Sequence, residues 1–116
     1  MRDFKKLKIW QKGFEIAIKA YELTSSFPKS EQYGLVSQIN RCAISIISNI
    51  AEGSSRASDR DYKRFVEISI GSTFELETQL LISQAIKMGE GELITELLIE
   101  IDEEQKMLFA FKRSLE

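Results

Sequence analysis

Histidine is absent from this sequence of 116 residues. Its absence excludes serine and cysteine mechanisms that rely on a histidine base, and also the Glu-x-x-His di-iron sites of some helical bundles. Zinc would find one thiolate, from Cys42, and carboxylates, which together are poor ligands. No glycine-rich phosphate loop occurs either. The sequence therefore predicts a protein that is not an enzyme, with no catalytic residue, no cofactor and no metal site.

Cysteine and proline are also scarce, with one of each. A lone cysteine cannot form a disulfide within the chain, and we expect it to be an inert thiol on a buried helix. No apolar run approaches the roughly 20 residues that a membrane span requires. The charged start of the chain, residues 1–6, lacks the apolar segment of a signal peptide. These features predict a cytoplasmic protein that does not interact with membranes.

Hydrophobic residues make up 43% of the chain and charged residues 29%. That balance and the length favour one folded domain over residues 1–116 with a single core. The net charge of −2 conceals an uneven distribution. Residues 1–28 hold six basic and three acidic groups, whereas residues 89–116 hold three basic and eight acidic groups. Such asymmetry is typical of a polyanion site or of complementary contacts between subunits.

Apolar residues recur every three or four positions in four segments, which is the period of an α-helix. The spacing predicts helices near residues 4–24, 30–53, 59–88 and 92–114. Ser58 and Asp61 resemble an N-terminal cap, and Gly53 is a natural C-terminal cap. The last helix has a heptad-like seam comprising Ile94, Leu97, Ile101, Leu108, Phe111 and Leu115. Short connections favour an all-α fold, an antiparallel up-down-up-down four-helix bundle.

The second and third helices have more apolar surface than one bundle can bury. The apolar arc of helix 30–53 exceeds half of its circumference, whereas a bundle covers a stripe a little over 100° wide. Gly71 lies within helix 59–88, where close approach of another helix is the usual compensation for glycine. Attraction between the basic first helix and the acidic last helix of neighbouring copies would add to association. We therefore expect a homo-oligomer, either a ring or a dimer.

A strip of short polar side chains follows the second helix, and two carboxylates lie in the third. The strip comprises Gln38, Arg41, Ser45, Asn49 and Glu52, and the carboxylates are Glu75 and Glu77. Because a buried charge needs a partner, we expect Arg41 to pair with Glu52, Glu75 or Glu77, within a subunit or between subunits. A structural network that sets helix register is favoured over a ligand or catalytic site.

Basic residues form two clusters that precede or open helices. The first comprises Arg2, Lys5, Lys6, Lys8 and Lys12, and the second comprises Arg56, Arg60, Lys63 and Arg64. In an antiparallel bundle the first and third helices run parallel, so both clusters are expected at one end. Cations oppose the dipole at a helix N-terminus, and a polyanion would offset that penalty. The two interpretations are a surface that contacts phosphates and an ordinary solvated end of the bundle.

Several short motifs also resemble a known family. They include Leu7-Lys8-Ile9-Trp10-Gln11, Ser48-Asn49-Ile50-Ala51-Glu52-Gly53 and Gly71-Ser72 followed by Glu75-Leu76-Glu77-Thr78. From Phe4 to the last helix, the chain resembles the bacterial four-helix-bundle family encoded in 23S rRNA intervening sequences. The resemblance implies an antiparallel bundle that assembles into a ring, with a homopentamer as the familiar state. It also implies kinship with the basic accessory protein of diversity-generating retroelements, although this chain is mildly acidic.

The residues and the resemblance together favour a non-enzymatic, ring-forming bundle that serves as a nucleic-acid-associated accessory or scaffold, with RNA as the favoured nucleic acid. Its expected partners are further copies of itself, RNA or DNA, and a protein. The alternative is a purely structural or protein–protein interaction module without affinity for nucleic acid.

Overall fold

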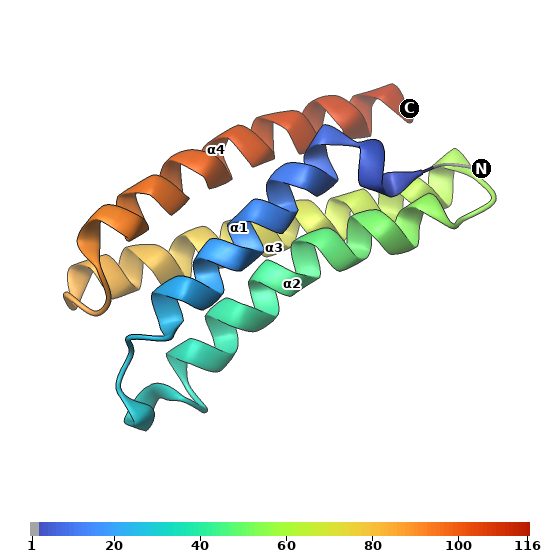
Figure 1. The fold of residues 1–116 in the computed structure, drawn as a ribbon. Helices are drawn as coiled ribbons and strands as arrows, with labels where there is room; N and C mark the ends of the chain where they lie inside the picture. Colours follow the sequence, from blue (N-terminus) through green and yellow to red (C-terminus); the bar gives the residue numbers. More distant parts are fainter. Residues whose placement is uncertain (1–2) are drawn as a thin grey trace.

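Four long helices make up most of the computed structural model, which describes residues 3–116 (Figure 1). They are α1 (Lys8–Thr24), α2 (Leu35–Ser54), α3 (Asp59–Ala85) and α4 (Gly91–Ser114), with short 3₁₀ turns η1 (Phe4–Lys6) and η2 (Lys29–Glu31). No strand occurs within the described range, so the predicted all-α class is confirmed. None of the helices between residues 3 and 116 has the length and apolar character needed to cross a bilayer.

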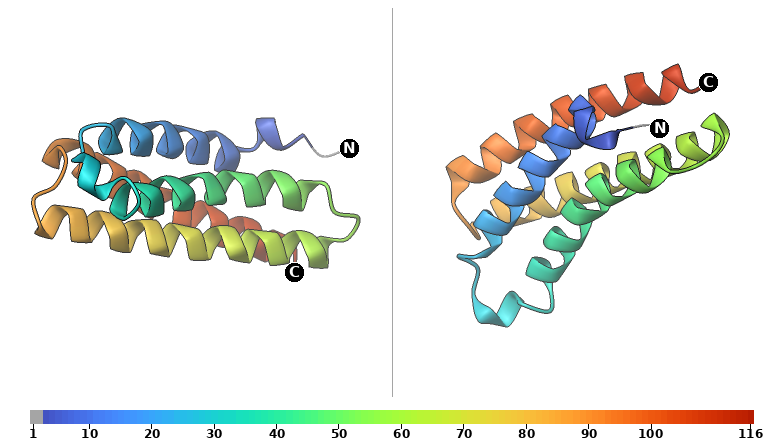
Figure 2. Two further views of the ribbon diagram at one scale, coloured as in Figure 1. Left: turned by 90° about the horizontal axis from the view of Figure 1, so that it is seen from below. Right: turned by 45° about the vertical axis from the view of Figure 1, so that its right-hand side comes forward.

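Each helix packs against two others. α1 contacts α2 and α4, and α3 contacts the same two helices, whereas the diagonal pairs do not approach each other in residues 3–116. Successive helices run in opposite directions, as Figure 2 shows from two sides. The predicted antiparallel up-down-up-down bundle is therefore confirmed. The start of α1, the start of α3 and the end of α4 all lie at one end of the molecule (Figure 1).

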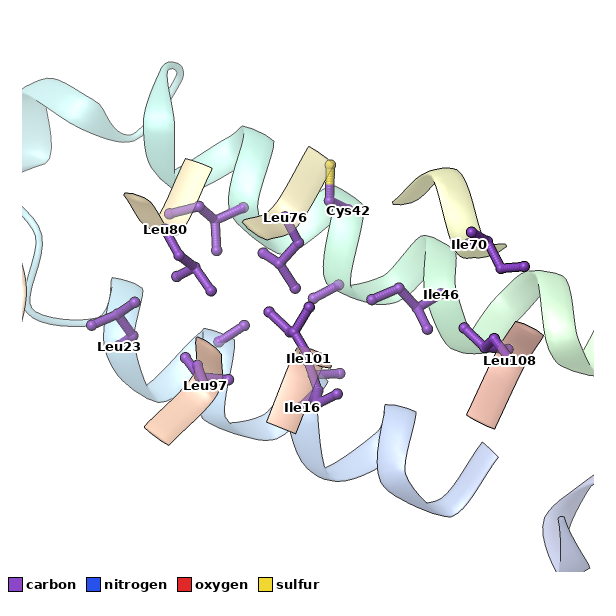
Figure 3. Packing of buried hydrophobic residues seen from close by; sticks show 14 of the residues in the cluster. Ile16, Leu23, Cys42, Ile46, Ile70, Leu76, Leu80, Leu97, Ile101 and Leu108 are labelled. Atoms are coloured by element: carbon purple, nitrogen blue, oxygen red, sulfur yellow. The ribbon is translucent and has the colours of Figure 1, made fainter. Parts of the chain in front are cut away.

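The core consists of aliphatic side chains that all four helices contribute (Figure 3). Fully buried members include Ile16, Leu23, Ile46, Leu76, Leu80, Leu97, Ile101 and Leu108. Burial of each such side chain contributes roughly 1.5–3 kcal/mol before the entropy cost of folding. The seam predicted in the last helix is confirmed: its residues 94, 97, 101 and 108 are buried, and 111 and 115 are half-buried against the core.

The helix boundaries follow local hydrogen bonding and backbone geometry. The Ser58 side chain accepts a hydrogen bond from the Asp61 amide at 3.1 Å, which confirms the predicted N-terminal cap of α3. α1 begins four residues later than expected because Leu7 is extended after the turn η1. α3 ends three residues early, because Lys87 (φ 57°) and Gly89 (φ 87°) adopt left-handed backbone conformations that stop the helix.

Two glycines have roles that differ from those expected. Gly53 does not cap α2, since the helix continues to Ser54. A Cβ atom on Gly53 would lie 2.8 Å from Phe65 Cβ and 2.9 Å from Tyr62 Cδ1, so this glycine allows α2 and α3 to cross closely. Gly71, by contrast, is exposed and would have no atom within 4 Å of its Cβ. The close approach of α2 and α3 therefore depends on Gly53, and Gly71 makes no close helix contact within residues 3–116.

Candidate nucleic-acid interface and polar sites

The first basic cluster lies on the turn η1 and the first residue of α1. Lys5, Lys6 and Lys8 are exposed and form no ion pair within residues 3–116. Asp3 caps η1, since its carboxylate accepts a hydrogen bond from the Lys5 amide at 3.2 Å. Arg2, which was predicted to join this cluster, lies outside the described residues. Three ammonium groups are thus left to solvent beside the N-terminus of α1.

The second basic cluster surrounds a surface recess of about 600 Å³ at the start of α3. Its lining includes Arg60, Lys63 and Arg64, together with Ser58, Asp61 and Glu67. Arg60 is exposed and has no ion pair in the described part of the chain, whereas the Arg64 guanidinium lies 3.9 Å from the Asp61 carboxylate. The recess is therefore basic on balance, but its carboxylates reduce the positive potential.

The other two members of this cluster, Lys63 and Arg56, form shorter ion pairs than Arg64 does. Lys63 Nζ lies 3.0 Å from Glu116 Oε2, which raises the pKa of Lys63 and lowers that of Glu116. Arg56 pairs with Glu52 at 3.0 Å, and its guanidinium lies 4.6 Å from the centroid of the Phe65 ring. These contacts hold the end of the bundle together, so both cations would have to exchange partners to contact phosphate.

The two clusters lie at the same end of the bundle, as the predicted topology requires. A groove of about 320 Å³ is lined by Leu7 from the start of α1, Asp59 and Tyr62 from the start of α3, and Leu115 from the end of the chain. The groove thus lies between the residues that precede α1, the start of α3 and the chain's end, and its charged lining residues are Asp3 and Asp59.

Lysines of α1 pair with carboxylates of α4 inside the same chain. Lys12 Nζ lies 3.3 Å from Glu103, and Lys19 Nζ lies 2.6 Å from Glu96 and 2.8 Å from Glu100. Hydrogen bonds from Lys19 to Glu100 and then Glu96 raise the pKa of Lys19 further above its usual value. The attraction expected between copies is thus satisfied within one subunit, and Lys12 differs from its neighbours in having a partner.

Part of the predicted polar network links α2 to α3. The Asn49 amide donates to the Ser45 carbonyl at 2.8 Å and to the Ser45 hydroxyl at 3.0 Å. The Ser72 hydroxyl then donates to Ser45 Oγ at 2.8 Å, and the buried Ser69 hydroxyl donates to the Ile46 carbonyl at 2.8 Å. These bonds satisfy short polar groups at the helix contact, which agrees with a structural role.

The pairing of Arg41 expected within one subunit is wrong. Arg41 is exposed, because it lies one position before the buried Cys42 on α2 and therefore points away from the helix contact. Glu52 pairs with Arg56, and Glu77 accepts a hydrogen bond from Gln105 Nε2 at 2.8 Å. An exposed guanidinium is already solvated, so it needs no carboxylate inside the chain. Gln38 is exposed as well, and a pairing of Arg41 between subunits stays a prediction.

Cys42 and Glu75 form a separate contact. Gln79 Nε2 donates to Cys42 Sγ at 3.4 Å, and the thiol lies 3.9 Å from Glu75 Oε2, a weak interaction. Burial raises the pKa of the Cys42 thiol, which outweighs the hydrogen bond from Gln79. A protonated thiol is a poor nucleophile, so this geometry agrees with the expected inert cysteine.

One charged residue in the core was not anticipated. Glu104 of α4 is fully buried, and neither of its carboxylate oxygens has a hydrogen-bond partner within the described residues. Burial raises the pKa of Glu104 to about 8, although the charge of Lys12 partly opposes this shift. The sequence does contain an indication that Glu104 is buried. The apolar seam has a seven-residue step between Ile101 and Leu108, and position 104 falls on the seam within that step.

The arrangement defines a class of protein: an antiparallel helical bundle with a basic end, an α1–α4 ion-pair seam and no cluster of three metal-ligating side chains among residues 3–116. The family model described as "23S rRNA-intervening sequence protein" matches residues 5–110. The chain belongs to this family, which confirms the resemblance deduced from the motifs.

A solved structure has the same fold. It is a protein with unknown function from the S23 ribosomal protein family of Bacteroides thetaiotaomicron, 21% identical to this chain. The similarity covers 89% of this chain and 96% of that one, with a TM-score of 0.79. No curated protein matches the sequence. At this level of identity the comparison supports the fold alone.

Proposed function

We propose that this protein is a non-enzymatic bundle that forms a homo-oligomeric ring, with five copies as the expected number, and acts as an RNA-associated accessory or scaffold. The observation that supports this proposal is a set of exposed cations at one end that form no ion pair with any residue from 3 to 116: Lys5, Lys6, Lys8 and Arg60. They lie beside the N-termini of α1 and α3, where the helix dipoles add positive potential. Phosphates would neutralise charges that the chain itself leaves unpaired.

Kinship with the accessory protein of diversity-generating retroelements is a further part of this proposal and rests on the sequence motifs. The mildly acidic net charge does not oppose it, because Lys12 and Lys19 of α1 already pair with three carboxylates of α4, Glu96, Glu100 and Glu103. The charge available to a polyanion is therefore set by the basic end and less by the sum over the chain.

Nucleic-acid binding is expected to depend steeply on salt. Each phosphate neutralised releases counterions, which gives slopes of log affinity against log salt of roughly −0.7 per contact for single strands and −0.9 for duplex DNA. Changing Lys5, Lys6 and Lys8 together to glutamate is expected to abolish binding in a fluorescence anisotropy titration. A matched control is the change of Lys29, Lys87 and Lys106 to glutamate, which gives the same net charge but alters exposed positions elsewhere.

The control variant should retain the affinity and salt slope of the wild type. Binding that ignores salt, or that survives the first triple change, would contradict the proposal. A stable oligomer that binds no nucleic acid at low salt would favour the alternative, a purely structural or protein–protein interaction module.

Self-association is expected to involve the outer side of α3. Its exposed apolar side chains include Ile68, Phe74, Leu81 and Ile82, and Ile86, directly after the helix, is exposed as well. Sedimentation equilibrium at micromolar concentration should give about five times the 13.3 kDa chain mass. The double change Ile82→Lys and Ile86→Lys should lower that mass, because charges would replace apolar contact surface.

The control for this experiment is Ile99→Lys, an equally exposed isoleucine on α4, which should leave the oligomer unchanged. A wild-type monomer would disprove the oligomer, and a well-defined dimer would disprove the ring.

A further inference from the structure

Aromatic side chains run along the outer face of α1. Trp10 packs edge-to-face against Phe4 with ring centroids 5.4 Å apart, and Phe14 lies tilted at 5.3 Å from Trp10. Phe14 is 45% exposed, and Tyr21, further along the helix, is 50% exposed. The buried side of α1 is occupied by aliphatic side chains such as Ile16. Trp10 packs partly against the core, whereas Phe14 and Tyr21 present ring surface to solvent.

The spacing of the row fits stacked bases. Phe14 and Tyr21 are seven residues apart, which is about 10 Å along a helix that rises 1.5 Å per residue. Successive bases on one strand rise about 3.4 Å, so this distance corresponds to about three bases. Ile18 lies between the two rings and is 57% exposed. The face thus offers two π surfaces with apolar surface between them.

Positive charge lies at one end of the row. Lys5, Lys6 and Lys8, which form no ion pair among residues 3–116, stand at the start of α1. The exposed Glu15 and Glu22 lie three residues before and four residues after Ile18, so these two carboxylates border one side of the face. Phosphates along this face would therefore meet cations at the start of α1.

From this combination we infer that the outer face of α1 binds single-stranded nucleic acid, with bases stacked on Phe14 and Tyr21 and phosphates held by the lysines at the start of the helix. The inference rests on the proposed association with nucleic acid and narrows it to unpaired strands. Stacking on exposed rings requires open base faces, which a duplex conceals.

The test compares one strand in two forms. The probes are a labelled 12-nucleotide oligoadenylate RNA and the same strand paired with oligouridylate. The double change Phe14→Leu and Tyr21→Leu keeps the apolar surface but removes both rings, and should weaken single-strand binding roughly tenfold or more. Duplex binding and the salt slope should not change, since no charge is removed. In the wild type the fluorescence of Trp10, the single tryptophan, should change when the single strand binds.

The matched control is Phe109→Leu, an exposed aromatic residue of α4 that belongs neither to the α1 face nor to the apolar side chains of α3 named above. This variant should bind both probes as the wild type does. The inference is overturned if the Phe14 and Tyr21 variant keeps its single-strand affinity or loses affinity for both probes equally. It is also overturned if that variant sediments with a lower mass, because a second copy would then cover the face.

Different results would refute the stacking inference and the proposed function. A wild type that binds both probes equally, with a steep salt slope, refutes stacking and leaves the proposed function standing. A wild type that binds neither probe at low salt refutes both.

Discussion

Replacing Glu104 by leucine is expected to raise the free energy of unfolding by several kcal/mol near pH 8. The carboxyl group is fully buried with neither oxygen hydrogen-bonded in the described chain, so its charged form is costly in the folded state. Its pKa of about 8, against an ordinary value of 4.5, corresponds to roughly 4–5 kcal/mol, an order-of-magnitude figure, at about 1.4 kcal/mol per pKa unit. Leucine has a suitable shape for the apolar seam and needs no proton.

The same shift determines how stability varies with pH. Between pH 4.5 and about 8 the folded state keeps the Glu104 proton, whereas the unfolded chain has released it. Because the folded state binds more protons in this window, the stability of the wild type falls as pH rises and levels off above about pH 8. Below pH 4.5 Glu104 is protonated in both states, so its ionisation no longer lowers the stability of the folded protein.

Urea denaturation at pH 5, 7 and 9 and at fixed protein concentration measures this effect. Glu104→Gln is the matched control, since it keeps the size and polarity of the side chain but removes the titration. The free energy of unfolding of Glu104→Gln should lack the pH dependence that Glu104 causes in the wild type. Glu104→Leu should lack it too, and should also be more stable than the wild type. An unchanged pH slope in both variants would show that Glu104 ionises freely in the folded protein.

Two glycine-to-alanine changes are expected to have opposite effects on stability. Gly53→Ala should destabilise the bundle by about 1–3 kcal/mol, the range for overpacking. The new methyl group would lie 2.8 Å from Phe65 Cβ, which is attached directly to the backbone and cannot rotate away. α2 and α3 would have to separate along their contact.

Gly71→Ala serves as the comparison, because its Cβ would meet no atom within 4 Å. Alanine in the interior of a helix is favoured over glycine by roughly 1 kcal/mol, so this variant should be more stable than the wild type. Thermal unfolding of both variants measures these changes in stability. Destabilisation by Gly71→Ala with a lower sedimentation mass would indicate that Gly71 lies at a contact between copies, whereas a tolerated Gly53→Ala would contradict the close crossing of α2 and α3.

The sequence by itself was sufficient for the fold, the helix count and the apolar seam of the last helix, but not for the first helix, where the apolar Phe14, Ile18 and Tyr21 are exposed. The reason is that helical periodicity is a local property: residues such as Ile94, Leu97 and Ile101 lie on one face whatever they pack against. The cap at Ser58 was also predictable, since the side chain and the amide that it binds are three residues apart. Short connections then left the antiparallel bundle as the simplest packing of four helices.

Only the tertiary structure decided which polar groups are buried and which partners they have. Arg41 was expected to be buried in an ion pair, yet it is exposed, whereas the unpaired Glu104 lies in the core. The lysines of α1 find carboxylates more than 70 residues away, as in the contact of Lys19 with Glu96. Burial and ion pairing depend on the rotation and axial position of each helix against its neighbours, and small changes in either move a side chain from solvent to core.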